Sequence, residues 1–181
     1  YDTIVTALKT KDAGKFLYTV EFFPEEGKYH FDGHRKCHVR FSPEETKQRN
    51  FRCPTCGRAV TVGVMHRVEK LADRAEGHTP ANAIPFTHTV PLEEIIAEAL
   101  GVGVGTQAVE REYVTLIDRC GTEFAVLLKS SEEDLRRVAP PRIAEGIIRM
   151  RQGDVQIEPG YDGEYGKVRV FAGQEPAAEQ Q

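Results

Sequence analysis

Apolar residues recur three and four positions apart through most of the second half of the chain. This spacing predicts amphipathic helices over residues 91–100, 106–120, 131–139 and 141–153. The run EFAVLL at 123–128 fits either a strand or a further helix, and VQIEPGYDGEYGKVRVF at 155–171 predicts two short strands around a Gly/Asp loop. We therefore expect a mainly helical region that ends in a β-hairpin.

The first half of the chain mixes shorter patterns. YDTIVTALKT at 1–10 predicts a helix, KFLYTVEFF at 15–23 a strand and AVTVGV at 59–64 a second strand. Ser42 and Pro43 are typical of the start of a helix over 42–50, and apolar spacing predicts another helix over 65–74. Residues 75–91 contain three prolines and little periodicity, which indicates a loop or linker.

Three of the four cysteines lie in this mixed half, with zinc-ligand spacing. His34-x2-Cys37-x15-Cys53-x2-Cys56 offers two pairs of ligands, the pattern of a zinc ribbon. His34 is favoured as the fourth ligand by its spacing, and its rivals are His30, His38 and His66. We expect one structural zinc, with all four positions filled by protein. A redox C-x-x-C is the alternative, but it leaves Cys37 unexplained, and Cys120 is predicted to be a buried apolar residue.

The fold class that follows is α+β and multi-unit. A small zinc-ribbon-like unit precedes a mainly α-helical region with a short C-terminal β-hairpin. No apolar run approaches the roughly 20 residues of a membrane helix, so we expect a cytoplasmic protein without a membrane partner.

Charge is distributed unevenly along the chain. The net charge is −4, yet residues 28–74 carry eleven Lys/Arg against five Asp/Glu. A basic segment on an acidic chain is a candidate surface for a polyanion. The cations flanking the cluster are candidates for phosphate contact: Arg35, Lys36, Arg52 and Arg58.

The stretch LGVGVGTQAVEREY at 100–113 resembles a helix-hairpin-helix, in which backbone amides at a glycine turn hold DNA phosphates. Gly103 and Gly105 are the candidate contacts, because glycine lets the backbone approach a phosphate closely. A small residue expected six places after the first glycine of the turn is instead Val109, and a tight turn between packed helices remains the alternative.

Four longer stretches, at residues 22–37, 53–74, 83–105 and 158–171, resemble the endonuclease Q family. The resemblance implies a DNA-repair protein that cuts 5′ of deaminated bases, and at abasic sites, with catalytic metals held by a preceding PHP-type domain. It implies a PHP remnant at 1–27, followed by a zinc-binding unit at 28–74 and a helical domain at 92–171. Composition and periodicity predict the linker at 75–91 and a disordered tail at 172–181. No catalytic residue is expected within the chain, and DNA is the expected partner.

The resemblance also implies that lesion recognition lies partly beside the zinc cluster. A flipped base needs an aromatic face and polar groups for its edge, and the candidates are Tyr29, His30, Phe31, His34 and Arg35. The alternative is that Tyr29 and Phe31 pack the hairpin against the zinc unit. Two other functions stay open. The zinc unit is alternatively a protein-interaction module for a helicase or another repair partner, or Asp32 and His34 form a hydrolytic metal site of their own.

Overall fold

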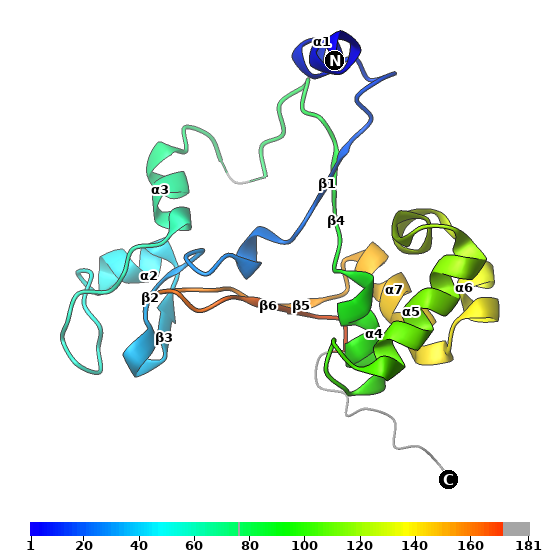
Figure 1. The fold of residues 1–181 in the computed structure, drawn as a ribbon. Helices are drawn as coiled ribbons and strands as arrows, with labels where there is room; N and C mark the ends of the chain where they lie inside the picture. Colours follow the sequence, from blue (N-terminus) through cyan, green and yellow to red (C-terminus); the bar gives the residue numbers. More distant parts are fainter. Residues whose placement is uncertain (76, 172–181) are drawn as a thin grey trace. The chain divides into compact units, whose positions relative to one another are not determined.

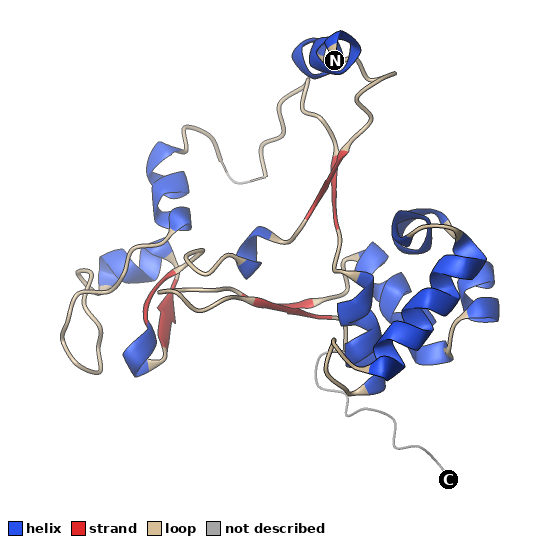
Figure 2. Cartoon of the chain, viewed as in Figure 1, coloured by secondary structure: helices blue, strands red, loops and turns tan. Residues whose placement is uncertain are grey.

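A computed structural model describes residues 1–75 and 77–171 (Figure 1). The chain forms two compact units. Of the described residues, unit 1 holds Tyr1–His88 and Pro159–Gly166, and unit 2 holds Thr89–Glu158 and 167–171. The predicted tail at 172–181 lies outside the described residues. The expected α+β organisation is confirmed, with the helices and short strands that Figure 2 shows. A Cys/His cluster lies in unit 1.

The start of unit 1 is an open arrangement. Helix α1 (Asp2–Thr10) matches the prediction but buries no residue, and its Ile4 and Leu8 side chains are exposed. Strand β1 (Thr19–Glu21) is shorter than predicted and pairs in parallel with β4 (Phe86–His88). Strand β4 lies in the stretch predicted as a loop or linker. The three prolines of that stretch indicated irregular structure, so this short extended segment was not predicted. Beyond β1, Pro24–Glu26 form the 3₁₀ turn η1.

The rest of unit 1 surrounds a small hairpin. Strand β2 (Asp32–His34) pairs antiparallel with β3 (Val39–Phe41), and the 3₁₀ turn η2 (Arg35–Cys37) joins them. Helix α2 (Pro43–Gln48) begins at the predicted cap, and α3 (Val64–Leu71) follows a loop. The predicted strand at 59–64 is wrong: the described backbone makes only isolated bridges there, from Ala59 to Arg52 and from Thr61 to Gly33.

The start of α2 shows why the local prediction succeeded. The Glu45 backbone N–H donates to Ser42 Oγ at 3.3 Å, and the Ser42 N–H donates to the Glu45 carboxylate at 2.8 Å. This reciprocal pair satisfies two amides that would otherwise lack partners at the helix start.

Residues 159–166 complete unit 1 although they are distant in sequence. The Phe31 N–H donates to the Gly160 carbonyl at 2.9 Å, and the Gly163 N–H donates to the Lys28 carbonyl at 2.8 Å. A Cβ at Gly160 would lie 2.5 Å from the Gly27 carbonyl oxygen, so only glycine permits this approach. The tip of the C-terminal hairpin is thus hydrogen-bonded to the segment that precedes β2.

Unit 2 consists of helices and the two strands of that hairpin. It contains α4 (Leu92–Leu100), α5 (Gln107–Cys120), the π-helix η3 (Ala125–Lys129), α6 (Glu132–Val138) and α7 (Pro141–Gln152). Strands β5 (Gln156–Glu158) and β6 (Lys167–Arg169) pair antiparallel, as predicted. The run at 123–128 is helical, so its strand alternative is wrong. Helix α4 packs against α5 and α7.

A dense apolar core holds unit 2 together. The large side chains that are less than 2% exposed include Leu92, Ile95, Ile96, Leu116, Leu127, Leu135, Ile143 and Ile147. The Arg151 guanidinium donates to three carbonyl oxygens, those of Val126, Leu127 and Ser130, each at 2.7 Å. Cys120 is half-buried rather than buried. None of the helices in the described residues is long and apolar enough to cross a membrane.

Candidate metal centre and basic surface

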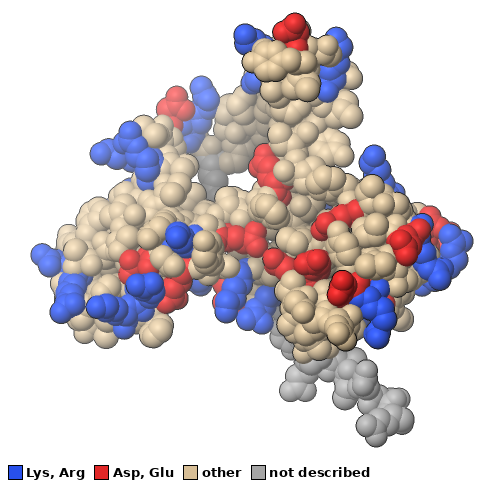
Figure 3. Space-filling view, in the orientation of Figure 1, with Lys and Arg blue, Asp and Glu red and all other residues tan. Residues whose placement is uncertain are grey.

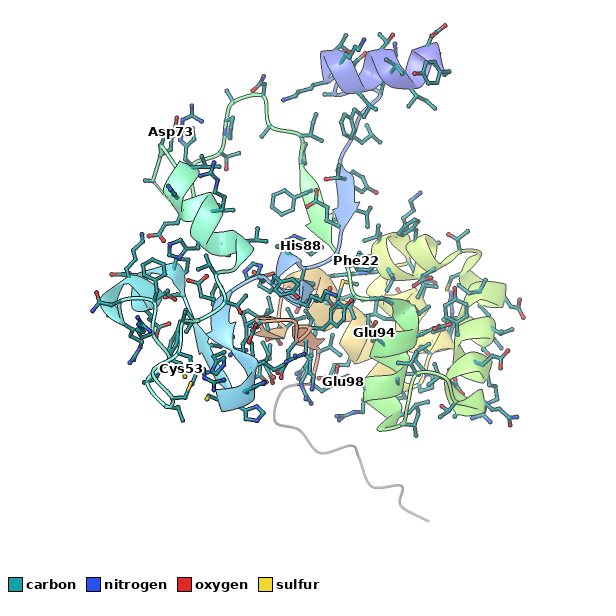
Figure 4. The ribbon with its side chains drawn as sticks, turned by 60° about the vertical axis from the view of Figure 1, so that its left-hand side comes forward. Phe22, Cys53, Asp73, His88, Glu94 and Glu98 are labelled. Carbon is teal, nitrogen blue, oxygen red and sulfur yellow. The ribbon has the colours of Figure 1, made fainter. Side chains whose placement is uncertain are left out.

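The four predicted ligands converge in unit 1. His34, Cys37, Cys53 and Cys56 each offer a donor atom, and these atoms all lie within 4.8 Å of one another. His34 ends β2 and Cys37 ends η2, while Cys53 and Cys56 lie in the loop that follows α2; Figure 4 labels Cys53. Among the residues that the structure describes, no other group of His, Cys, Asp or Glu converges in this way.

The Cys53–Cys56 segment has the backbone of a metal knuckle. The Cys53 N–H donates to the Arg58 carbonyl and the Gly57 N–H donates to the Cys53 carbonyl, both at 2.8 Å. Gly57 has a φ of 70°, the left-handed conformation that glycine adopts at least cost. Cys56 Sγ lies 3.4 Å from His34 Nδ1, close to the roughly 3.5 Å that tetrahedral zinc imposes on neighbouring donors.

The pKa values of two thiols of the cluster, those of Cys53 and Cys37, are strongly perturbed. Burial raises the pKa of Cys53, but hydrogen bonds from the Cys56 and Thr55 backbone and from His34 outweigh it and lower that pKa to about 6. Burial raises the pKa of Cys37 to about 11, with contributions from Cys56 and Cys53. Closely spaced sulfurs resist losing all their protons unless a cation neutralises them. A donor set of one imidazole and three thiolates fits zinc.

The other histidines considered as the fourth ligand, His30, His38 and His66, do not belong to the converging group. Asp32 is fully buried, accepts from the Gly63 N–H at 2.6 Å and lies 2.9 Å from His66 Nδ1. Its two oxygens therefore tie β2 to the start of α3, while His34 faces the cysteines. Asp32 and His34 have different partners, so the geometry gives the hydrolytic metal site no support.

Most of the predicted nucleic-acid contacts in unit 1 are exposed. Arg35, Lys36, Arg52 and Arg58 are exposed around the cluster, whereas His30 is buried. The Arg52 guanidinium donates to the Gly57 carbonyl at 3.2 Å, which fixes it beside the knuckle. Figure 3 shows Lys and Arg side chains gathered over the part of unit 1 that holds α2 and β3.

Two residues of this surface, Arg35 and Lys28, have partners in the 159–166 loop, and no sequence pattern predicted these contacts. Asp162 accepts from the Arg35 N–H at 2.7 Å and from Thr61 Oγ1 at 2.5 Å. Burial raises the pKa of Asp162, but these hydrogen bonds and the Arg35 charge outweigh it and lower the pKa. Lys28 Nζ lies 5.8 Å from the ring centre of Tyr29 and 5.6 Å from that of Tyr165.

In unit 2, Gly103 and Gly105 lie in the exposed loop between α4 and α5. A Cβ at Gly105 would meet no atom within 4 Å, and one at Gly103 would meet only the Thr106 methyl, at 4.0 Å. Neither glycine has a positive φ. The packing and the backbone of the described chain therefore do not require glycine at either position.

The chain is similar to several known proteins. The family model for the MJ0043 C-terminal domain matches residues 91–154. Protein MJ0043 of Methanocaldococcus jannaschii is 39% identical over 80% of this chain and 18% of its own length. Protein YqxK of Bacillus subtilis is 33% identical over 90% of this chain and 38% of its own length. Both relatives are described as uncharacterized.

Two solved structures carry more functional information. The lesion-specific endonuclease PfuEndoQ from Pyrococcus furiosus matches 84% of this chain and 38% of its own, with TM-score 0.74 and 29% identity. Endonuclease Q bound to a 27-mer duplex with an abasic lesion at the active site matches 93% of this chain and 42% of its own, with TM-score 0.76 and 28% identity. The chain spans less than half the length of each of these relatives.

Proposed function

From this confirmed resemblance to endonuclease Q, we propose that the chain is the DNA-binding, zinc-containing portion of an endonuclease that cuts 5′ of deaminated bases or at abasic sites. The observation that carries the proposal is the similarity over 93% of the chain to an endonuclease Q captured on a lesion-bearing duplex. The exposed cations around the Cys/His cluster supply the chemistry that such a duplex requires, since phosphate neutralisation dominates DNA affinity.

The zinc is structural in this proposal. His34, Cys37, Cys53 and Cys56 would hold it, and the closed set of four ligands leaves no position for substrate. The bound ion stabilises the loop that presents Arg52 and Arg58. Because the cluster segment buries little else, loss of the metal also disperses the phosphate-binding cations.

The cutting centre belongs, in this proposal, to a PHP-type domain that precedes Tyr1. The open start of unit 1 supports this arrangement. A parallel sheet is ordinarily covered on both faces, yet β1 and β4 form a two-stranded ribbon, with Val20 and Phe86 exposed. Ile4 and Leu8 of α1 are exposed as well, and a domain packed on this region would cover all four side chains.

The glycine loop of unit 2 supplies a second DNA contact. Because nothing in the described chain requires glycine at 103 or 105, we assign both to a close approach of a phosphate to the backbone. Replacing Gly105 by alanine would keep the fold, as open space surrounds its Cβ position, and would weaken DNA binding.

The test is fluorescence anisotropy of the chain with a labelled duplex over a range of salt concentrations. Arg35→Ala and Arg58→Ala should each weaken binding and lower the salt slope by about one. Lys9→Ala, on α1 and away from the cluster, is the matched control and should leave both unchanged. Equal affinity of all variants, or no binding by the parent chain at physiological salt, would contradict the proposal.

A further inference from the structure

The thiols of the Cys/His cluster differ in how far they are shielded from solvent. Cys53 is 1% exposed and belongs to the small core beside the cluster, and Cys37 is half-buried against that core. Of the three cluster cysteines, only Cys56 is exposed. A small oxidant in solution therefore has its most open path to the sulfur of Cys56.

The chain around Cys56 leaves this path open. Residues 54–59 are all exposed, and a Cβ at Gly57 would meet no atom within 4 Å, so no part of the described chain covers the turn on that side. Arg52 and Arg58, which are also exposed, add positive charge to the same loop. Exposed thiolates in electropositive surroundings are the reactive class of cysteine, whereas buried structural cysteines are inert.

Cys53 is placed to form a disulfide with Cys56. Two residues separate them in a single turn, which the hydrogen bond from the Gly57 N–H to the Cys53 carbonyl closes at 2.8 Å. Their sulfurs belong to the group of donor atoms that all lie within 4.8 Å of one another. Cys37 is on a separate segment, at the end of η2, so a disulfide from it would have to move two segments toward each other. The C-x-x-C spacing is also that of dithiol redox sites.

We propose that Cys56 and Cys53 form a peroxide-reactive dithiol, and that their oxidation to a disulfide releases the structural zinc and weakens DNA binding. The C-x-x-C then has a redox role in addition to metal ligation. The effect on DNA rests on the function proposed above, whereas the reaction of the thiols does not. Oxidation would act on the loop that presents Arg52 and Arg58, because that loop depends on the metal.

The oxidation has two steps, with hydrogen peroxide as the oxidant. The Cys56 thiolate attacks one peroxide oxygen, so that an S–O bond forms, the O–O bond breaks and the leaving hydroxide takes a proton to become water. The Cys53 thiolate then attacks the Cys56 sulfur, so that the S–S bond forms, the S–O bond breaks and a second hydroxide leaves and is protonated.

The two sulfurs together lose two electrons in this sequence, and hydrogen peroxide is reduced to two molecules of water. Because the thiolate is the form of cysteine that ligates metals, the disulfide removes two of the four ligands. Only His34 and Cys37 then remain, and two ligands do not make the closed tetrahedral set of a structural zinc site.

The first test adds hydrogen peroxide to the zinc-loaded chain and follows free zinc with a chromogenic chelator. Zinc should be released in step with one disulfide, Cys53–Cys56, which is located by mass spectrometry of the digested chain. Dithiothreitol and added zinc should restore the bound metal. Absence of zinc release, or a disulfide that joins Cys56 to Cys37 or to Cys120, would overturn the inference.

Variants locate the reactive sulfur. Cys56→His exchanges the exposed thiolate for another zinc ligand and should slow peroxide-driven release at least about tenfold, since oxidation follows thiolate exposure. Cys37→His keeps both cysteines of the turn and should still release zinc with the same disulfide. Cys120→Ser, outside the cluster, is the control and should release zinc as fast as the parent. Equal rates for Cys56→His and the parent would overturn the inference. Where Cys56→His binds no zinc, the disulfide found in the parent chain decides.

DNA binding separates this inference from the proposed function. In anisotropy with a labelled duplex, the oxidised chain should bind at least about tenfold more weakly than the reduced, zinc-loaded chain, because phosphate contacts are lost. Reduction in the presence of zinc should restore the affinity. Failure of the reduced chain to bind DNA would overturn the proposed function, while zinc release still reports on the thiols. Full affinity of the oxidised, zinc-free chain would overturn the regulation proposed here.

Discussion

The two units of this chain are stabilised by different means. Unit 2 buries a continuous set of large aliphatic side chains from α4, α5, η3, α6 and α7. Around the Cys/His cluster, unit 1 buries only Phe41, Cys53 and Val60, with Cys37 and Val39 packed against them. A core that small contributes little hydrophobic stabilisation, so metal ligation must supply much of the folding free energy of unit 1. The cations proposed to bind DNA around the cluster thus lie on the unit that depends on its metal, whereas the glycine loop proposed as a second contact lies on unit 2.

The largest expected effect comes from removing a ligand. Cys53→Ser removes one of the four ligands and should release the metal. The effect should be large, because structural zinc contributes about 10–16 kcal/mol in small domains. DNA binding through the cations around the cluster should be lost with the metal. The helical circular dichroism signal of unit 2 should persist. Elemental analysis and anisotropy measure the two losses, and Cys120→Ser, a half-buried cysteine of α5, is the matched control. Retention of one zinc by Cys53→Ser would contradict the dependence of unit 1 on its four ligands.

The reverse experiment introduces a cavity into the apolar core of unit 2. Ile147→Ala removes a fully buried side chain of α7 and should destabilise unit 2 by about 2–5 kcal/mol in chemical denaturation. The zinc stoichiometry should stay at one, since no ligand lies in unit 2. Val114→Ala, at a position 48% exposed on α5, should change little. Loss of zinc in the Ile147 variant would show that the units do not fold separately.

A smaller effect should follow from the buried carboxylate of unit 1. In Asp32→Asn one of the two acceptor oxygens becomes an amide N–H₂, so either Gly63 or His66 faces a donor instead of an acceptor. We expect a cost of about 1–3 kcal/mol in the stability of unit 1, read from the denaturation midpoint of its tyrosine fluorescence. Asp73→Asn, at an exposed position after α3, is the control (Figure 4). Unchanged stability of Asp32→Asn would mean that the contacts of Asp32 with Gly63 and His66 do not stabilise unit 1.

The smallest effects come from one cap in each unit. Ser42 begins α2 in unit 1, and Ser131 begins α6 in unit 2, with each side chain accepting a hydrogen bond from a backbone N–H. Replacing either serine by alanine should cost about 1 kcal/mol. Ser42 is not a metal ligand. Excess zinc should therefore reverse the loss of stability in Ser42→Ala less readily than it would reverse the effect of weakening a ligand. Thermal denaturation of both variants checks this, and a cost far above 2 kcal/mol in either would contradict it.

Sequence patterns predicted the parts of the molecule that depend on neighbours along the chain. The helices of unit 2 follow from apolar spacing, the start of α2 from Ser42 and Pro43, and the Cys/His cluster from ligand spacing. The hairpin at 155–171 was also predicted. Each of these features is encoded within about twenty residues, so a local pattern suffices.

The features that the sequence did not predict depend on contacts across long separations. Strand β4 pairs with β1 across more than sixty residues of chain, and Asp162 bonds Thr61 across 101 positions. The predicted strand at 59–64 failed because Ala59 and Thr61 bond two different partners, so that no ladder forms. The contacts that shape the proposed binding surface are mostly of this kind.

Whether the metal stabilises unit 1 alone can be measured by amide hydrogen exchange of the whole chain, with zinc bound and after its removal by a chelator. Removal of zinc should abolish protection in β2, β3 and the loop from Cys53 to Gly63, while α4, α5 and α7 keep theirs. Added zinc should restore the lost protection. Unchanged protection of both units after zinc removal, or loss of protection in both units, would contradict the claim that the metal stabilises unit 1 alone.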